Sequence, residues 1–486
     1  MNFPQGLAGL TALALLVGCS GSSSGGGEAG SAGTSGGGGG GVAGATGGTG
    51  GVGGAAGSAG AAGSAGSAGS AAPVTANLTV SAAAPVAVAP TFFGQNYWSW
   101  VPAWGDPVAS VQEKTAGLGL GLLRAGGANN DRQNPGPFSL AEVDDFVAFA
   151  HAVGAEPLLQ VPVLKNLAGD AATAQDAADL VTYVNVTKTY GIKYFAIGNE
   201  PDLYESQGDM PAGYDAAAFC ATFKEFANAM KAVDDTIQIV GPDLSWKYQT
   251  GSTDWLTPFL EGCGDVTDIV AVHRYPLPPT SCTDTAAYAD VTSYRTALTH
   301  LHGILTATGQ ASKPLAITEA NITWDGDPAK STMAASPGTF PAALWVADNL
   351  GASLEAGLFS VDYWSLSEGW TLGFFSGATP RPAFHVLDLF SNHFGSQVLS
   401  VSGAPTGVSV YAGRNPGESS TSLFVVNKTT SPLELEIAFT DHPRSATASL
   451  VVSPLSLQMA IVADDGSAPV VTDYSEGMSE PTPATP

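Results

Sequence analysis

Two glutamates each follow an apolar run that predicts a buried strand. Glu200 comes after the segment 194–198, and Glu319 comes after 315–318. Strands of a parallel sheet that is covered on both faces are nearly continuous apolar runs, and their carboxyl ends meet at one face. We therefore expect the two carboxyl groups at the mouth of a barrel, where one could donate a proton and the other could act as a nucleophile.

A simpler interpretation also exists for these two residues. In a chain with 43 acidic residues, a glutamate after an apolar strand can cap a helix or be solvated. This alternative stays open for Glu319 taken alone. It is weaker for Glu200, which lies inside the segment Gly198-Asn199-Glu200-Pro201.

Eight apolar segments alternate with stretches whose apolar residues recur at helical spacing, which predicts an α/β fold. Strand–helix alternation repeated eight times predicts a (β/α)8 TIM barrel over 91–390, with Glu200 after strand four and Glu319 at the end of strand seven. The expected strands are 92–97, 122–125, 157–161, 194–198, 237–241, 269–273, 315–318 and 358–363, and the clearest helices are 140–153, 174–190, 214–233 and 340–356.

The pattern changes after residue 390 to short alternating strands separated by Gly, Pro, Asn and Ser. Together with a strand in 75–90, the region 391–466 predicts an accessory C-terminal β-sandwich against the flank of the barrel. A separate carbohydrate-binding module is the alternative, but no Gly/Ser-rich linker precedes residue 391. The expected strands are 77–88, 408–412, 422–427, 433–439, 446–452 and 457–462.

The first nineteen residues predict export. The apolar run 7–17 is too short to span a bilayer but suits the core of a signal peptide. Leu16-Val17-Gly18-Cys19 resembles a bacterial lipobox, which implies a lipid on Cys19 and, with Ser20 next, an outer-membrane location. The first six residues lack Lys and Arg, so a misplaced start or a leader for plain secretion stays open.

Segments of biased composition flank the expected domains. Residues 20–74 are nearly all Gly, Ala, Ser and Thr, which predicts a flexible tether. The tail 467–486 is rich in Pro, Thr, Ser and Glu, and we expect it to be disordered. With 17 Lys plus Arg against 43 Asp plus Glu, the formal charge of −26 argues against a nucleic-acid partner.

The cysteines fit an exported protein. Beside Cys19 the chain has Cys220, Cys263 and Cys282, which allow one disulfide and one free thiol. Cys263 precedes a strand and Cys282 follows its far end, so we expect these two on opposite faces of the barrel. The pair Cys220 with Cys282 is then the easier one. The spacing does not predict a zinc site or any other metal site.

The motifs resemble those of a known clan. Gly198-Asn199-Glu200-Pro201 with a second glutamate on strand seven resembles the retaining glycoside hydrolases built on (β/α)8 barrels. Within that clan, Arg124-Ala-Gly-Gly127, Gly198 to Tyr204 and Gly241-Pro242-Asp243 resemble family 79, the β-glucuronidase and heparanase relatives, while families 30, 39 and 44 share parts of the layout. The resemblance implies a carbohydrate substrate and no cofactor.

The same resemblance assigns roles to the residues. Glu200 corresponds to the acid/base, Glu319 to the nucleophile, and Asn199 to the residue that binds the sugar 2-hydroxyl. Retaining enzymes hold the two carboxyl groups about 5 to 5.5 Å apart, one protonated and the other ionised.

Four further residues are expected to support this pair. Arg124, at the end of strand two, is the candidate cation that keeps Glu319 ionised, or else part of a rim ion pair. After strand six, Tyr275 could donate to Glu319, and His273 is either part of the site or a structural histidine. Trp364, directly after strand eight, is the candidate platform under the reacting sugar, although a single tryptophan is more often part of a core.

These observations together predict an exported, lipid-anchored, monomeric retaining β-glycoside hydrolase with a saccharide substrate. A non-catalytic surface protein that binds saccharides is the alternative, and a structural protein on a Gly-rich stalk is a third. A glucuronide would need a cation or several hydrogen-bond donors for its carboxylate. The sequence maps no such pocket, and Arg132, Lys247 and Arg274 are merely nearby in the loops of the mouth.

Overall fold

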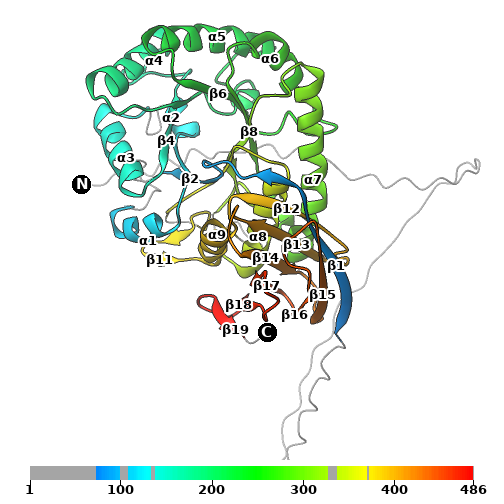
Figure 1. The fold of residues 1–486 in the computed structure, drawn as a ribbon. Helices are drawn as coiled ribbons and strands as arrows, with labels where there is room; N and C mark the ends of the chain where they lie inside the picture. The colour runs from blue at the N-terminus through cyan, green and yellow to red at the C-terminus, as the bar shows by residue number, and fades with distance from the viewer. Residues whose placement is uncertain (1–72, 99–107, 133–136, 327–336, 369–370, 485–486) are drawn as a thin grey trace, which may run out of the picture. The chain divides into compact units, whose positions relative to one another are not determined.

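The computed structural model describes residues 73–98, 108–132, 137–326, 337–368 and 371–484. A closed barrel of parallel strands carries its helices on the outside, and a second, mostly antiparallel sheet is built from the two ends of the described chain (Figure 1). The predicted fold class is confirmed. The expected leader, Cys19 and most of the expected tether lie outside the described residues.

The barrel has eight strands that pair in chain order and close between the last and the first. All eight predicted strands are present, with ends that differ by a few residues. The strands are β2 (Phe93–Tyr97), β3 (Leu122–Ala125), β4 (Glu156–Val161), β5 (Tyr194–Ile197), β6 (Gln238–Leu244), β7 (Ile269–Arg274), β8 (Leu315–Ala320) and β9 (Ser360–Tyr363).

Successive residues of each barrel strand point to opposite sides, and both sides are buried. One set fills the barrel interior with aliphatic and small side chains, among them Leu122, Leu158 and Ala316. Their neighbours along the same strands pack against the surrounding helices, as Leu123, Leu159 and Ile317 do. This burial on both sides explains why the strands read as continuous apolar runs.

The described helices lie outside the barrel, and several of them begin with a side chain that accepts a hydrogen bond from the first turn. In α3, for example, Ser139 and Glu142 form a reciprocal capping box. The expected helix 174–190 is an α-helix followed by a π-helical turn. The bounds are α1 (Gln112–Gly117), α2 (Ala128–Asp131), α3 (Leu140–Ala152), α4 (Ala174–Val181) with η2 (Thr182–Thr187), α5 (Ala216–Val233), α6 (Leu256–Cys263), α7 (Asp284–Ala307), α8 (Phe340–Glu355) and α9 (Pro382–His393), with short 3-10 turns η1 (Val108–Ser110), η3 (Pro201–Leu203) and η4 (Pro279–Ser281).

The second sheet has nine strands in the order β16-β15-β1-β12-β13-β14-β17-β18-β19. The strand before the barrel, β1, lies in its middle, parallel to β15 and antiparallel to β12. A separate pair, β10 (Phe375–Ser376) and β11 (Thr379–Pro380), follows the barrel. The sheet strands are β1 (Val74–Ala87), β12 (Gln397–Ser402), β13 (Val408–Arg414), β14 (Ser420–Asn427), β15 (Leu433–Thr440), β16 (Ala448–Val452), β17 (Ser456–Ala463), β18 (Val470–Ser475) and β19 (Thr482–Ala484).

This sheet has two buried surfaces. Aliphatic residues from β1 and from β13 to β18, such as Leu78, Leu423 and Leu450, form a core of their own, as expected of a β-sandwich. The other surface packs on the helices next to the barrel, where the ring of Phe424 lies 4.2 Å from that of Phe390 in α9. Strands from both ends of the chain therefore attach the sheet to the flank of the barrel.

The prediction of a disordered tail over 467–486 is wrong for most of that segment. The tail adds β18 beside β17 and then β19 beside β18. Val471 and Tyr474 are each only 1% exposed, and the ring of Tyr474 packs on Phe340 of α8. The content of Pro, Thr, Ser and Glu indicated disorder. The tail is ordered because its short strands pair with the sheet edge that β17 offers.

The expected pairing of Cys220 with Cys282 is also wrong. Cys220 forms the disulfide with Cys263, with a Cα–Cα distance of 5.7 Å, and Cys282 is a buried free thiol. Cys220 lies in the first turns of α5, and Cys263 is the last residue of the neighbouring helix α6. Because α6 has only eight residues, its end stays beside the start of α5, which the positions relative to the strand did not indicate.

None of the described helices combines the length and the apolar character that a membrane span requires.

Candidate active site

Glu200 lies in a tight turn that directly follows the fourth barrel strand. Gly198 has a φ of 73° and Glu200 a φ of 51°, so both adopt the left-handed conformation. The backbone N–H of Glu200 donates to the carbonyl oxygen of Asp243 at 2.9 Å, which ties this turn to the fifth strand. The Glu200 side chain is 19% exposed, so a leaving group and water can reach it.

Glu319 lies near the end of β8 and is only 6% exposed. Its Oε1 accepts a hydrogen bond from Nη1 of Arg124 at 2.9 Å, and its Oε2 accepts one from Oη of Tyr275 at 2.9 Å. Both contacts were expected from the sequence. Burial and the charge of Glu319 raise the pKa of Tyr275 well above its usual value, so its hydroxyl stays a donor.

Arg124 contacts more groups than the sequence suggested. It is fully buried and also donates to Oδ1 of Asn96 at 2.8 Å, to Oδ1 of Asn199 at 2.9 Å and to Oδ2 of Asp243 at 3.2 Å. Burial lowers its pKa, but the carboxylates of Asp243 and Glu319 outweigh burial and hold the pKa above the usual value. This permanent cation therefore connects four strands of the barrel beneath the mouth.

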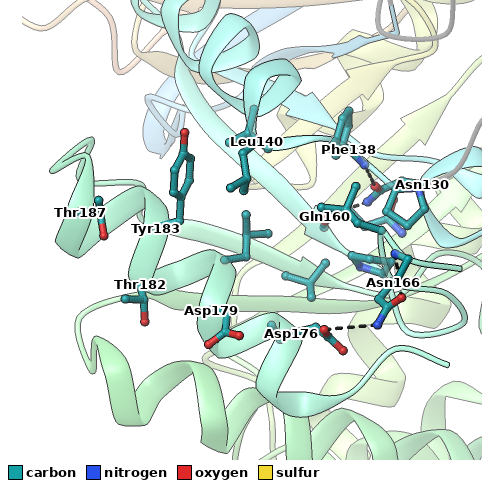
Figure 2. A pocket seen from close by; sticks show the side chains of 18 residues that line it. Asn130, Phe138, Leu140, Gln160, Asn166, Asp176, Asp179, Thr182, Tyr183 and Thr187 are labelled. Carbon is teal, nitrogen blue, oxygen red and sulfur yellow. Dashed lines mark hydrogen bonds between the residues drawn. The ribbon is translucent and has the colours of Figure 1, made fainter. Parts of the chain in front are cut away.

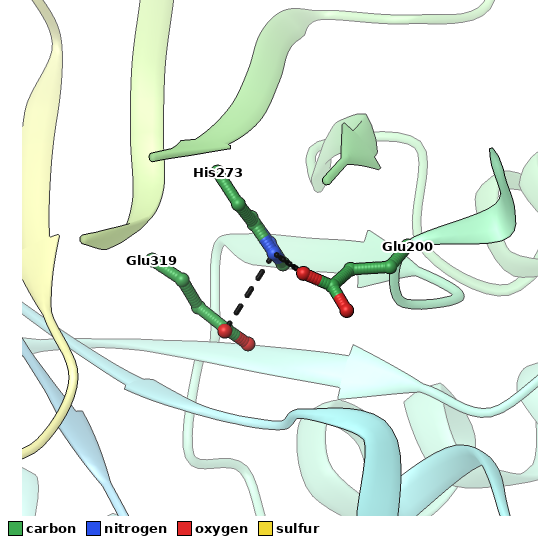
Figure 3. A group of neighbouring side chains, drawn as sticks. All are labelled: Glu200, His273 and Glu319. Atoms are coloured by element: carbon green, nitrogen blue, oxygen red, sulfur yellow. Dashed lines mark hydrogen bonds and ion pairs between the residues drawn. The ribbon is translucent and has the colours of Figure 1, made fainter. Parts of the chain in front are cut away.

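His273 stands between the two predicted catalytic carboxyl groups (Figure 3). Its Nδ1 lies 3.1 Å from Oε1 of Glu200 and 3.6 Å from Oε2 of Glu319, and its Nε2 lies 3.9 Å from Oδ2 of Asp243. Burial lowers the pKa of His273, but Glu319, Asp243 and Glu200 together raise it to about 10. These carboxylates therefore favour the protonated ring, and His273 lies beside both residues of the predicted pair.

Asp243 is a site residue that the sequence reasoning named only as part of a motif. It is fully buried below the mouth and accepts a hydrogen bond from Oγ1 of Thr318 at 2.7 Å as well as the contact from Arg124. Burial raises its pKa, but Arg124 and His273 lower it to about 2. The sequence did contain one sign of this site residue. Asp243 follows the apolar run 237–241, just as Glu200 follows the run 194–198.

A second hidden carboxyl group lies deeper in the barrel. Asp362 on β9 is fully buried, and burial raises its pKa well above the usual value, with only partial compensation by Arg124. Gly94 on the adjacent strand makes room for it, because a Cβ there would lie 1.7 Å from Oδ1 of Asp362. The apolar sequence around Asp362 gave no sign of this polar group inside the barrel.

The predicted sugar platform lies beside Glu319. Trp364 is 8% exposed and packs against Trp98 with ring centroids 5.0 Å apart. A Cβ on Gly127 would lie 2.7 Å from the Trp364 ring and 3.8 Å from Oε1 of Glu319. Gly127 therefore lies next to both the Trp364 ring and the carboxyl group of Glu319. Trp246 and Trp324, at 37% and 45% exposed, are the accessible tryptophans among the described residues of the loops after the strands.

A separate hollow of about 560 Å³ opens on the flank beside β4, between α3 and α4 (Figure 2). Its walls are mainly apolar, and it contains neither Glu200 nor Glu319. It approaches the site through Asn130 and Gln160. Gln160 accepts a hydrogen bond from the backbone N–H of Gly127, whereas its Nε2 has no partner among the described residues.

The three cations of the loops near the mouth that the sequence pointed out are already engaged. Arg132 pairs with Asp209 at 2.7 Å. Arg274 pairs with Asp290 at 2.5 Å and stacks on a tyrosine ring, and the Lys247 ammonium lies over the ring of Trp255.

Glu200, His273 and Glu319 each bring one donor atom to within 4.8 Å of the others, which fits a paired-carboxylate site. Three such groups could also hold a metal ion. The pKa of His273 argues against this use, because a metal would have to displace a tightly held proton. The expectation of no metal stays a prediction.

Residues 156–336 match the sequence model of a family described as "Glycosyl hydrolase catalytic core", and this segment includes both Glu200 and Glu319. No curated protein matches the sequence.

Solved structures share the fold at low sequence identity. The bifunctional glucanase-xylanase CelM2 from a metagenome library aligns with a TM-score of 0.64 at 15% identity, over 81% of this chain and all of the other. A family 44 xyloglucanase of Paenibacillus polymyxa gives 0.62 at 15%, over 80% and 100%. The α-L-arabinofuranosidase of Thermotoga maritima gives 0.63 at 16%, also over 80% and 100%.

The likeness to these structures shows a shared fold. Together, the matched catalytic-core segment and that fold support a glycoside hydrolase of the (β/α)8-barrel clan.

Proposed function

We propose that the protein is an exported retaining β-glycoside hydrolase. The observation that carries this proposal is the approach of carboxyl oxygens of Glu200 and Glu319 to within 4.8 Å at the mouth of the barrel. Retaining enzymes hold their carboxyl groups about 5 to 5.5 Å apart, whereas inverting enzymes need roughly 6.5 to 9.5 Å to admit a water molecule between them.

In the proposed reaction, Glu319 attacks the anomeric carbon while Glu200 gives its proton to the departing oxygen. Water, activated by Glu200, then releases the sugar from Glu319. Arg124 and Tyr275 hold the two oxygens of Glu319, so the attacking carboxylate has one orientation. Asn199 is positioned by Arg124, which leaves its amide Nδ2 to donate to a sugar hydroxyl.

We propose a neutral saccharide as the substrate. The cations that could bind a uronate are paired with acidic or aromatic groups, and the formal charge of −26 repels polyanions. Glucan, xylan and xyloglucan are the polymers that the names of structural neighbours mention. A β-glucuronide, which the resemblance to family 79 suggests, is the second candidate.

The test is to follow hydrolysis of aryl β-glycosides and of these polysaccharides by proton NMR. We expect the first product to carry the β-anomer, and only later the equilibrium mixture. First release of the α-anomer would overturn the retaining mechanism, and activity on glucuronides alone would overturn the neutral substrate.

A non-catalytic protein that binds saccharides at a surface is the alternative function. The set of Glu200, Glu319, Asn199 and Arg124 is intact, and Arg124 donates to both Glu319 and Asn199, which favours catalysis over this alternative. Saccharide binding without turnover on any substrate of the panel would support the binding protein instead.

We propose a lipid anchor on Cys19. The wild-type protein should partition into detergent with membranes, and Cys19→Ser should release it. Recovery of soluble wild-type protein that begins beyond residue 19 would indicate plain secretion.

A further inference from the structure

The turn that carries Asn199 and Glu200 has a backbone that must be held in place from outside. Glu200 adopts the left-handed conformation, with φ 51° and ψ 52°. For a residue other than glycine this costs roughly 1–2 kcal/mol, so the turn keeps this shape only if its surroundings enforce it. The shape matters because it decides where the carboxyl group of Glu200 and the amide of Asn199 point.

A buried tyrosine lies directly under this turn. Tyr204 follows the short helix η3, is 0% exposed, and its Oη accepts a hydrogen bond from the backbone N–H of Asn199 at 3.1 Å. A Cβ on Gly198 would lie 3.0 Å from the same oxygen. The tyrosine hydroxyl thus occupies the space that the glycine leaves and satisfies the N–H of the next residue.

The hydroxyl of Tyr204 is in turn oriented by a buried carboxylate. It donates to Oδ2 of Asp131 at 2.6 Å, and Oδ1 of Asp131 accepts from the backbone N–H of Val163 at 2.8 Å. Because the hydrogen of Tyr204 is committed to Asp131, its oxygen lone pairs face Asn199. The chain of contacts connects the loops after the second, third and fourth barrel strands.

Packing alone does not account for an acidic residue at this position. Asp131 is 0% exposed, and the guanidinium of the adjacent Arg132 is paired with Asp209. Burial raises the pKa of Asp131 to about 6, although Tyr204, Val163 and Arg132 oppose this. A neutral or apolar side chain would cost less to bury, so the carboxylate calls for a role beyond filling space.

We propose that Asp131 and Tyr204 are positioning residues that aim Asn199 and Glu200 at the substrate. This inference rests on the proposed glycosidase function. Asp131 orients the Tyr204 hydroxyl, Tyr204 fixes the N–H of Asn199, and the turn then holds the amide of Asn199 against Arg124 and the carboxyl of Glu200 toward the leaving group. Neither positioning residue touches the sugar.

The test compares Tyr204→Phe with Tyr214→Phe. The ring of Tyr214 lies 6.1 Å from that of Tyr204, and its hydroxyl has no hydrogen-bond partner among the described residues, so it is a matched control. Kinetics are measured on aryl glycosides whose leaving groups range from dinitrophenol to phenol. A small displacement of a catalytic group can cost on the order of 100-fold in rate.

We expect Tyr204→Phe to lower kcat/KM, which reports the first step, by about 10- to 100-fold on phenyl glycosides and much less on dinitrophenyl glycosides, which need little protonation by Glu200. The dependence of rate on leaving-group pKa should become steeper, while Tyr214→Phe keeps the wild-type dependence. The leaving-group dependence of Asp131→Asn should lie between those of the two tyrosine variants. Tyr204 and Val163 donate to different oxygens of Asp131, and the amide replaces one of these acceptors by an NH2 group.

Wild-type rates and leaving-group dependence in Tyr204→Phe would overturn the inference. So would an equal loss on all substrates together with a fall in melting temperature, because that pattern indicates a structural role alone. If Tyr204→Phe does not fold, Asp131→Asn decides by the same readout. A wild-type protein that hydrolyses no glycoside would instead refute the proposed function.

Discussion

The mouth of the barrel and the joint, where α8 packs against strands of the second sheet, each bury a carboxylate beside a cation. The two regions differ in how many hydrogen-bond partners these charged groups have. At the joint, Asp348 of α8 accepts from Oη of Tyr411 at 2.9 Å and pairs with Lys428, which also donates to Ser409 at 3.1 Å. Both charged side chains are almost fully buried, at 4% and 3% exposed. Asp348 and Lys428 therefore each have a further polar partner besides one another.

At the mouth, the charges are shared and incompletely satisfied. Arg124 is divided between Glu319 and Asp243, and His273 lies near three carboxylates. Nε of Arg124 and Nε2 of His273 have no hydrogen-bond partner among the described residues. A buried pair that is complete holds two parts of a fold together, whereas groups left incomplete are typical of a site that does chemistry.

The largest expected difference concerns activity. Glu319→Gly should lower kcat on the order of 10⁴-fold or more, since it removes the nucleophile. Azide should restore turnover by entering the vacated space and give a glycosyl azide of inverted configuration, detected by NMR. Full activity of this variant would remove Glu319 from the mechanism.

Glu200→Ala is the companion variant at the mouth. A dinitrophenyl leaving group needs little protonation, so the first step should persist while release of the sugar becomes slow. A burst of phenolate followed by slow turnover would show this. Wild-type rates on unactivated substrates would contradict the acid/base role.

Arg124→Met should lower kcat by about 100- to 1,000-fold, because the nucleophile loses its neighbouring positive charge. Steady-state kinetics on aryl glycosides measure this loss, and a wild-type kcat in Arg124→Met would contradict a role for this cation in catalysis.

At the joint we expect a loss of stability without a loss of catalysis. Lys428→Met leaves Asp348 buried without its cation and should lower the free energy of unfolding by about 3–5 kcal/mol. The exposed pair Lys193 with Glu156 provides the control, because Lys193→Met should cost no more than about 1 kcal/mol. Denaturant unfolding measures both, and kcat should remain at the wild-type value; a fall in kcat for folded Lys428→Met would contradict the comparison.

The last prediction concerns pH and His273. Because folding raises the pKa of His273 from 6.5 to about 10, its contribution to stability is complete below pH 6.5 and is lost as the pH rises toward 10. The loss from this group is at most about 5 kcal/mol. His273→Gln should therefore flatten the decline in unfolding free energy between pH 6.5 and pH 9.5. An unchanged decline would mean that the histidine is neutral in the folded protein.

Part of the site follows directly from local sequence. In a barrel of parallel strands the end of each apolar run must lie at the mouth, so the strand pattern was enough to place Glu200, Glu319, Arg124 and Tyr275 there. The two predicted hydrogen bonds to Glu319 follow from this placement. The roles of these residues in catalysis stay predictions.

Other features depend on contacts between segments that are distant in sequence. Whether Asp243 meets Arg124, or Tyr204 meets Asp131, depends on which side chains of several strands and loops point to the same spot. The disulfide between Cys220 and Cys263 likewise depends on how the neighbouring helices α5 and α6 are aligned along their axes.

The sequence by itself therefore determined the barrel, the order of its strands and the residues at their carboxyl ends, because burial on both faces leaves a pattern in every strand. Only the tertiary structure decided the disulfide, the ordered tail and the polar network beneath the mouth. These depend on partners brought together by packing, and a single buried aspartate or a short edge strand has no periodic pattern of its own.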